Sequence, residues 1–217
     1  MLEAVMDQSL AIRNIKTSLR ILNVLLIATI VIVSSCILLL FGLFVVALTV
    51  SGEKISKLVL DSNIDISFKF NGMTIFLNKD IMSNFVYDKS EAIILILLLM
   101  VFTLIFLSIF ILLRKFVKSV IVGDVFTLRN SKRIELVGYS LLILSFLNNT
   151  VQAYLVSTVV HIFLNNNELD NIEWIQSVSF RFFDINWSIL LCSFIVWTIG
   201  RIFRYGSFLQ EEFDETV

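Results

Sequence analysis

The chain has 217 residues, of which 58% are hydrophobic and only 16% are charged, and its mean hydropathy is +0.92. Soluble domains average roughly 45–50% apolar residues, so this composition excludes an ordinary soluble protein. The formal net charge of −1 leaves no basic surface of the kind that binds nucleic acid directly.

Four apolar segments predict four membrane-spanning helices, because a spanning helix needs about 20 predominantly apolar residues. The third segment is diluted by polar residues, and the fourth is extended by flanking aromatic residues. We therefore predict an all-α integral membrane protein with the following parts: an amphipathic N-terminal segment 1–20, span 21–50, an extracytoplasmic loop 51–91 with a β-hairpin at 64–78, span 92–113, a basic cytoplasmic loop 114–135, span 136–164, an extracytoplasmic loop 165–184, span 185–205 and an acidic cytoplasmic tail 206–217.

The distribution of Lys and Arg predicts the orientation. Eleven of these residues precede the first span, separate spans two and three, or follow span four, whereas six lie in the two other loops. Basic residues are enriched in the cytoplasmic loops of membrane proteins. Both termini are therefore expected in the cytoplasm.

The segment 64–78 has the alternating pattern of a β-hairpin, which is unusual beside such apolar helices. Its Asn71–Gly72 pair is typical of a type I′ turn and places Phe70 opposite Met73. We expect the hairpin to form an extracytoplasmic cap by packing on the projecting ends of spans one and three, although it could instead lie on the lipid interface. Its apolar face comprises Ile64, Ile66, Phe68, Phe70, Met73, Ile75 and Leu77.

Polar residues of the third span share one helical face at positions i, i+3, i+4 and i+7. They are Ser145, Asn148, Asn149 and Gln152. The favoured interpretation is hydrogen bonding between helices, and the alternative is a polar cavity for a small ligand. No catalytic motif is present, and the only histidine, His161, has no second histidine with which to share a metal. We expect no enzyme activity, no metal and no cofactor.

The basic loop is predicted to be a tight helix–turn–helix connection. Gly123 suits the end of the incoming helix and Thr127 the N-cap of the outgoing one. The tail carries four acids that could pair with basic residues of this loop, although exposed pairs of this kind are weak.

The stretches GDVFTLRNSKRI and GSFLQEEFDETV resemble the two signature stretches of the bacterial membrane family known as domain of unknown function 2975. The residues that carry the resemblance are Gly123, Phe126, Thr127, Asn130, Arg133, Gly206, Leu209, Gln210, Glu211, Asp214, Thr216 and Val217. Glu215 departs from the family, which usually has an apolar residue before the final Thr. The resemblance implies a bacterial inner-membrane protein without established activity, whose neighbour is often a small helix-turn-helix regulator.

Three functions remain open. The first is a sensory or regulatory membrane protein that couples the cap to a cytoplasmic partner, such as a helix-turn-helix regulator or another membrane protein. The partner surface would comprise Gly123, Phe126, Thr127, Asn130, Arg133, Leu209, Gln210, Glu211 and Asp214. The alternatives are an immunity protein against a membrane-active peptide, and a small transporter or transporter subunit that uses the polar face of span three.

Overall fold

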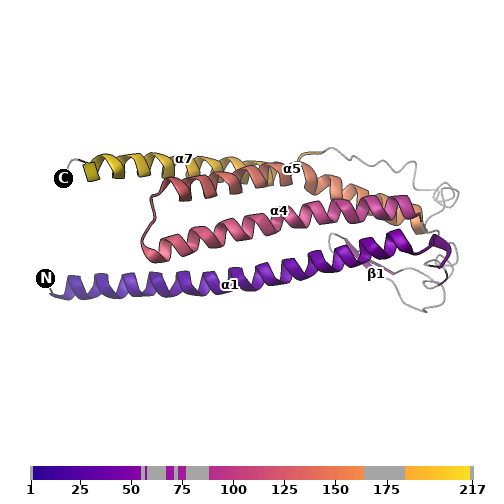
Figure 1. Ribbon diagram of the computed structural model, residues 1–217, viewed down its shortest axis with the longest axis horizontal. Helices are drawn as coiled ribbons and strands as arrows, with labels where there is room; N and C mark the ends of the chain where they lie inside the picture. The colour runs from indigo at the N-terminus through magenta and orange to yellow at the C-terminus, as the bar shows by residue number, and fades with distance from the viewer. Residues whose placement is uncertain are drawn as a thin grey trace. The chain divides into compact units, whose positions relative to one another are not determined.

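The computed structural model describes residues 2–54, 57, 67–70, 73–76, 88–163 and 184–215. In these residues the chain forms four long helices and one pair of strands (Figure 1). Their order and bounds are α1 (Leu2–Thr49), β1 (Ser67–Phe70), β2 (Met73–Phe76), α4 (Lys89–Val122), α5 (Leu128–Phe163) and α7 (Trp187–Glu215).

Each of the four helices contains a segment long and apolar enough to cross a membrane. These segments are Ile15–Thr49, Lys89–Val122, Leu128–Thr158 and Trp187–Phe213. Large apolar side chains along them are exposed, as Leu38 is at 73%. Surfaces of this kind are not stable in water, but they suit a hydrocarbon environment. The chain therefore fits a multi-pass membrane protein with four helices.

The helices extend beyond the predicted spans. α1 begins at Leu2, so the expected segment 1–20 is continuous with the first span, and α4 runs through the first part of the basic loop to Val122. α7 continues to Glu215, so the predicted tail is helical for most of its length. The sequence contains no Pro and only 7 Gly, and therefore offers few residues that end a helix.

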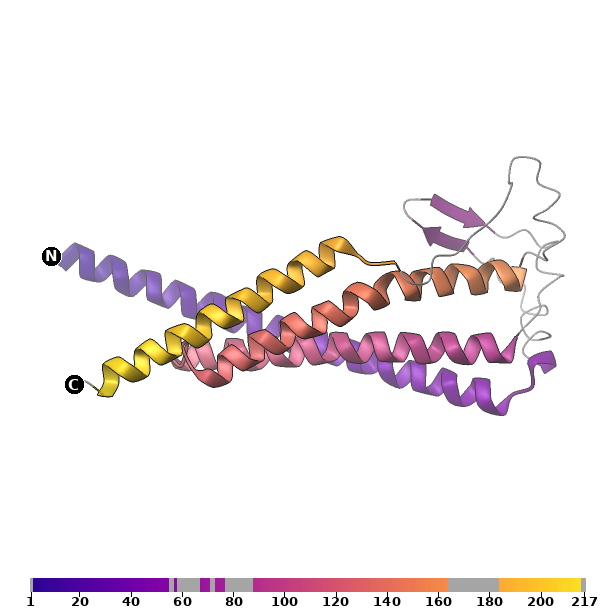
Figure 2. The ribbon, with the colours of Figure 1, turned by 90° about the horizontal axis from the view of Figure 1, so that it is seen from above.

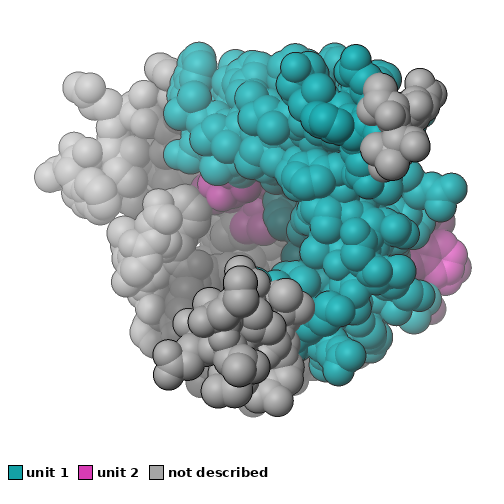
Figure 3. Space-filling model, turned by 90° about the vertical axis from the view of Figure 1, so that its left-hand side faces the viewer, with its two compact units in different colours: residues 1–38, 102–147, 185–217 teal, residues 39–101, 148–184 magenta. Residues whose placement is uncertain are grey.

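The helices divide between two compact units, coloured separately in Figure 3. Unit 1 comprises residues 1–38, 102–147 and 185–217, and unit 2 comprises residues 39–101 and 148–184. The core of unit 1 is formed by Ile109 of α4 with Val137 and Leu144 of α5. Further side chains of α4, α5 and α7 pack around these three residues, so the centre of unit 1 is a three-helix contact.

In unit 1, α5 and α7 run antiparallel (Figure 2). They touch along a seam that consists mostly of small residues. Three hydrogen bonds follow the seam: Ser131 Oγ donates to Gly200 O at 2.8 Å, Ser193 Oγ donates to Gly138 O at 3.0 Å, and Asn186 N donates to Ser145 O at 2.9 Å. From one bond to the next, the residue on α5 lies seven positions later in the chain, and its partner lies seven positions earlier. The last partner, Asn186, directly precedes α7. The small side chains let the two backbones approach closely, which is how helices associate in membranes.

Two glycines show how close this approach is. A Cβ added at Gly200 would lie 2.7 Å from Cγ and 3.0 Å from the backbone nitrogen of Glu135. A Cβ added at Gly138 would lie 3.0 Å from both the Cβ and the backbone nitrogen of Trp197. We call the contact of Ser131, Gly138 and Ser145 with Asn186, Ser193 and Gly200 the small-residue seam.

In unit 2, β1 and β2 pair antiparallel, with Phe70 opposite Met73 and Phe68 opposite Ile75. This is the register expected from a turn at Asn71–Gly72, which itself lies outside the described residues. Ile64, Ile66 and Leu77 also lie outside them, as do all side chains of the two strands. The docking of an apolar hairpin face on helix ends is therefore not supported by the described residues and stays a prediction.

The helix ends in unit 2 are held by polar contacts. Lys89 Nζ donates to the carbonyl oxygen of Leu48 at 2.7 Å and so connects the end of α1 to the start of α4. The carboxylate of Asp88 accepts from the backbone N–H groups of Ser90 at 2.7 Å and Glu91 at 3.3 Å. Asp88 is thus the N-cap of α4, a position that favours acidic and amide side chains.

Candidate functional site at the basic end of unit 1

We call residues 114–135 together with residues 199–215 the basic end of unit 1. At its centre is the turn between α4 and α5, whose backbone follows a Schellman motif. Gly123 has φ of +107°, Gly123 N–H donates to Val120 O, and Asp124 N–H donates to Ser119 O. Gly123 is therefore the helix-ending residue that the sequence predicts.

The start of α5 is also as predicted. Thr127 Oγ1 accepts from the backbone N–H of Asn130 at 3.2 Å, and Thr127 O accepts from Ser131 N–H at 3.0 Å. Thr127 is thus the N-cap, and one of the otherwise unbonded N–H groups at the helix start is satisfied by its side chain. The turn between the two helices is fixed at both sides.

Asn130 holds the turn together from inside. Its side chain is fully buried, and its Nδ2 donates to Asp124 O at 2.6 Å, to Val125 O at 3.1 Å and to Ser119 Oγ at 3.0 Å. Its Oδ1 accepts from Arg133. One amide therefore satisfies two backbone carbonyls of the turn and joins them to both helices, so the conformation of the turn depends on this side chain.

Arg133 connects α5 back to the last turns of α4. One terminal guanidinium nitrogen donates to the carbonyl oxygen of Lys115 and to Asn130 Oδ1, each at 2.9 Å. Arg133 was expected on a partner surface, and that role stays a prediction. Its two hydrogen bonds show that it fixes the distance between α4 and α5.

Glu135 provides the ion pairs between α5 and α7. Its side chain is only 8% exposed, and Arg204 Nη2 lies 2.5 Å from Oε2, while Arg201 Nε lies 3.7 Å from Oε1. Gly200 lies directly against Glu135, so the carboxylate reaches both arginines from within the small-residue seam. A buried carboxylate is costly unless it is paired. Arg204 supplies a hydrogen bond to Oε2, whereas buried Oε1 has only the longer ion pair with Arg201.

Phe126 closes the turn against α7. Its ring lies 5.1 Å from the ring of Phe203, which in turn lies 5.7 Å from that of Phe116. A Cβ at Gly206 would lie 2.9 Å from the Phe126 ring, so the missing side chain at Gly206 makes the space for Phe126. Phe126 and Gly206, which belong to the two separate stretches that carry the family resemblance, are in direct contact.

The end of α7 presents a mixed apolar and acidic surface. Tyr205 is 65% and Phe213 is 70% exposed, and Phe208 is also exposed. Leu209, Gln210 and Glu211, three predicted partner residues, are exposed on the same helix, whereas the side chain of Asp214 and residues Thr216 and Val217 lie outside the described residues. We call residues 205–213 the α7 tip.

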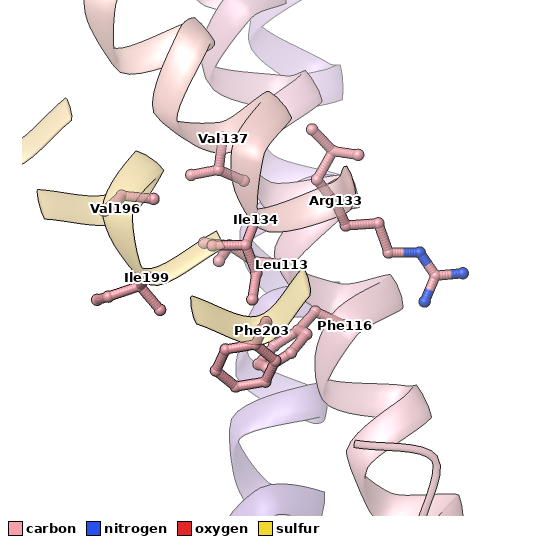
Figure 4. Close-up of a pocket in the computed structure, with 9 residues that line it drawn as sticks. Leu113, Phe116, Arg133, Ile134, Val137, Val196, Ile199 and Phe203 are labelled. Atoms are coloured by element: carbon pink, nitrogen blue, oxygen red, sulfur yellow. The ribbon is translucent and has the colours of Figure 1, made fainter. Parts of the chain in front are cut away.

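An apolar groove of about 290 Å³ lies on the α7 side of this region. It is lined by Leu112, Leu113 and Phe116 of α4, by Arg133, Ile134 and Val137 of α5, and by Val196, Ile199 and Phe203 of α7. Figure 4 shows that the guanidinium of Arg133 points away from the apolar side chains. The groove therefore offers no polar group that could orient a water-soluble substrate.

The residues of the predicted polar face of the third span divide between the two units. Ser145, in unit 1, is fully buried in the small-residue seam, and its hydroxyl donates to Leu142 O. In unit 2, Asn148 Nδ2 donates to Asn149 Oδ1 at 3.1 Å, and Gln152 is exposed. The hydroxyl of Ser145 therefore bonds within α5, and the expected hydrogen bonding between helices through this polar face stays a prediction.

The sequence interpretation missed Glu135, Arg201, Arg204 and the seam. Glu135 was placed at the end of the basic loop, although it lies buried against α7. A signal for the seam exists, since small residues recur every seven positions in both helices: Ser131, Gly138 and Ser145 in one, and Ser193, Gly200 and Ser207 in the other.

Among the described residues, no group of three His, Cys, Asp or Glu side chains could hold a metal ion.

Comparison with known proteins identifies one family. The model of the family described as "Protein of unknown function (DUF2975)" matches residues 76–217, which is roughly two thirds of the chain. The chain belongs to the DUF2975 family. The match contains α4, α5 and α7 with the whole basic end, whereas α1 and β1 precede it. No curated protein and no solved structure matches the chain.

Proposed function

We propose that this DUF2975 protein is a non-enzymatic regulatory membrane protein, and that its basic end docks a cytoplasmic protein partner. The observation that supports this function is the contact of Phe126 with Gly206 and Phe203. It joins the α4–α5 turn to α7, so the two signature stretches of the family form one surface. The excess of Lys and Arg at this end favours a cytoplasmic location.

The length of α7 favours a position of its tip outside the hydrocarbon. Twenty helical residues span about 30 Å, the thickness of the hydrocarbon core. Counted from Trp187, twenty residues reach Gly206, so the residues that follow project beyond the apolar layer. Phe208, which is 52% exposed, then lies beyond the lipid tails, and large exposed aromatic residues of this kind favour protein contacts.

The charge of the tip indicates the chemistry of the partner. Exposed Glu211 and Glu212 are adjacent and lie between Phe208 and Phe213 in the last turns of α7. An amphipathic helix of this type lays its apolar residues into a groove on its partner, and acidic residues beside it select a basic rim. The partner is therefore a soluble protein with an apolar groove bordered by Lys and Arg, a description that a small helix-turn-helix regulator can satisfy.

Site-specific photo-cross-linking in living cells tests this function. A benzophenone amino acid is placed at Phe208 or at Phe213, and a matched control carries it at Ile195, which is 60% exposed within the apolar part of α7. We expect a defined adduct with a soluble protein from the two tip positions and none from Ile195. Adducts with lipid alone, or the same adducts from all three positions, would exclude a partner surface at the tip.

The sensory part of the proposal depends on the hairpin lying on the opposite side of the membrane. Its test is the Lys69→Cys variant in a chain whose Cys36 and Cys192 are replaced by Ala. A membrane-impermeant maleimide should label the variant in intact cells. Labelling only after the membrane is opened would place the hairpin in the cytoplasm and remove the basis for an external sensor.

A further inference from the structure

We propose that the hollow between Lys115, Lys118 and Arg133 at the basic end binds the phosphate of an anionic phospholipid headgroup. This site does not depend on the proposed protein partner. The hollow has a volume of about 200 Å³ and is also lined by Ser119, Val122 and Asp124. Three cations and one carboxylate give it a formal charge of +2, which attracts the negative charge of a phosphodiester.

The two lysines share one face of α4. Lys115 and Lys118 are three residues apart, a spacing that places side chains on the same side of a helix. Both are exposed, and neither forms an ion pair with a carboxylate within the part of the chain that the structure describes. Their ammonium groups are therefore available for an external anion.

The arginine is positioned in advance. A single terminal nitrogen of Arg133 makes the bonds to Lys115 O and to Asn130 Oδ1, which leaves the other guanidinium nitrogens for a ligand. The guanidinium points away from the apolar groove (Figure 4), and it lines the basic hollow instead. A planar guanidinium that is already oriented binds phosphate oxygens with little further loss of entropy.

The position of the hollow along α4 favours a lipid over a soluble phosphate compound. The apolar stretch of α4 ends at Leu113, and Lys115 and Lys118 follow within the next two turns. Side chains at this place lie at the level of the headgroups. Basic pockets between helices at this level bind anionic headgroups in other membrane proteins.

Native mass spectrometry of the full-length protein tests the site. The protein is extracted from nanodiscs that contain equal amounts of phosphatidylglycerol and phosphatidylcholine, and the lipid that stays bound is identified. The test variant is Lys115→Gln/Lys118→Gln, which keeps Arg133 and its two bonds. The control variant is Arg129→Gln/Lys132→Gln, which removes the same charge from exposed positions of α5 outside the hollow.

We expect the original protein and the control variant to retain one phosphatidylglycerol. Removing two lysines near the membrane surface should weaken anionic-lipid binding about thirtyfold, and the test variant should lose the preference over phosphatidylcholine. Equal losses in both variants would mean that only the general surface charge acts, and the site would be refuted. An unchanged test variant would also refute it.

A second arm distinguishes the lipid from a soluble phosphate. Inorganic phosphate is added at millimolar concentration with the ionic strength held constant by chloride. Retention of the bound phosphatidylglycerol supports the headgroup assignment. The assignment would be overturned in favour of a soluble phosphate ligand by two results together. Phosphate would release the bound phosphatidylglycerol, and it would stabilise the original protein but not the test variant. Equal thermal unfolding of the two variants without phosphate confirms that both are folded.

Discussion

Replacing Gly200 by alanine tests the small-residue seam most directly. The added Cβ would lie 2.7 Å from Cγ of Glu135 and 3.0 Å from its backbone nitrogen. Carbon atoms pack best at about 3.5–4.0 Å, so α5 and α7 would have to separate by about 0.5 Å or more. Overpacking of this kind costs about 1–3 kcal/mol, whereas the higher helix propensity of alanine returns at most about 1 kcal/mol. We expect Gly200→Ala to lower the free energy of unfolding by about 1–2 kcal/mol.

The matched control is Gly42→Ala. Gly42 also lies in a membrane-spanning helix, but an added Cβ there meets nothing within 4 Å. Only the helix propensity changes, so Gly42→Ala should be neutral or stabilising by up to about 1 kcal/mol. Gly138→Ala should behave like Gly200→Ala, because its Cβ would meet the backbone of Trp197.

The measurement is equilibrium unfolding in mixed micelles by increasing SDS, followed by far-ultraviolet circular dichroism. The difference between Gly200→Ala and Gly42→Ala should be about 2 kcal/mol. If the two variants agree within about 0.5 kcal/mol, α5 and α7 do not approach as closely as the structure shows, and the seam does not hold them together.

The remaining predictions concern the basic end and use the same unfolding measurement. Gly123→Ala should cost about 1–3 kcal/mol through backbone strain alone, since φ is +107° and no atom crowds the site. Asn130→Ala should cost about 1–3 kcal/mol for each carbonyl of the turn that loses its amide donor. Backbone hydrogen exchange in the turn should also become faster. Unchanged exchange would contradict the role of Asn130. Arg204→Met should cost about 3 kcal/mol, because it leaves the buried carboxylate of Glu135 without its hydrogen-bonded partner. Arg201→Met removes the longer and more exposed contact and should cost less than about 1 kcal/mol. Equal costs would contradict this ranking.

Local signals in the sequence were sufficient for the helices and for the turn. The apolar segments predict the four spans because length and hydropathy depend on neighbouring residues only. Gly123 and Thr127 were predicted correctly for the same reason, since a helix end is decided within one turn of the chain. The strand register follows likewise from the two residues of the hairpin loop.

The α5–α7 contact could not be predicted in this way because it depends on which helix faces meet. Ser145 belongs to two patterns at once, the polar face with Asn148, Asn149 and Gln152 and the seven-residue repeat of small residues. The two repeats differ by only a few degrees per residue, so the sequence of one helix does not distinguish them. Only the matching repeat in α7 identifies the second pattern as the one that packs.

The seam also connects stability with the proposed function. The hydrophobic effect, which drives packing in water, is weak between helices in lipid. Close backbone contact at Gly138 and Gly200 must therefore hold α7 in place. Gly200 lies in the segment of α7 that leads to the tip, and it precedes Tyr205, the first residue of the tip. If a partner recognises the tip together with the α4–α5 turn, Gly200→Ala should reduce cross-linking from Phe208, because it displaces α7 relative to Phe126. Gly42→Ala should leave the same cross-link unchanged. Undiminished cross-linking in Gly200→Ala would mean that the partner binds the tip alone and that the turn is not part of the surface.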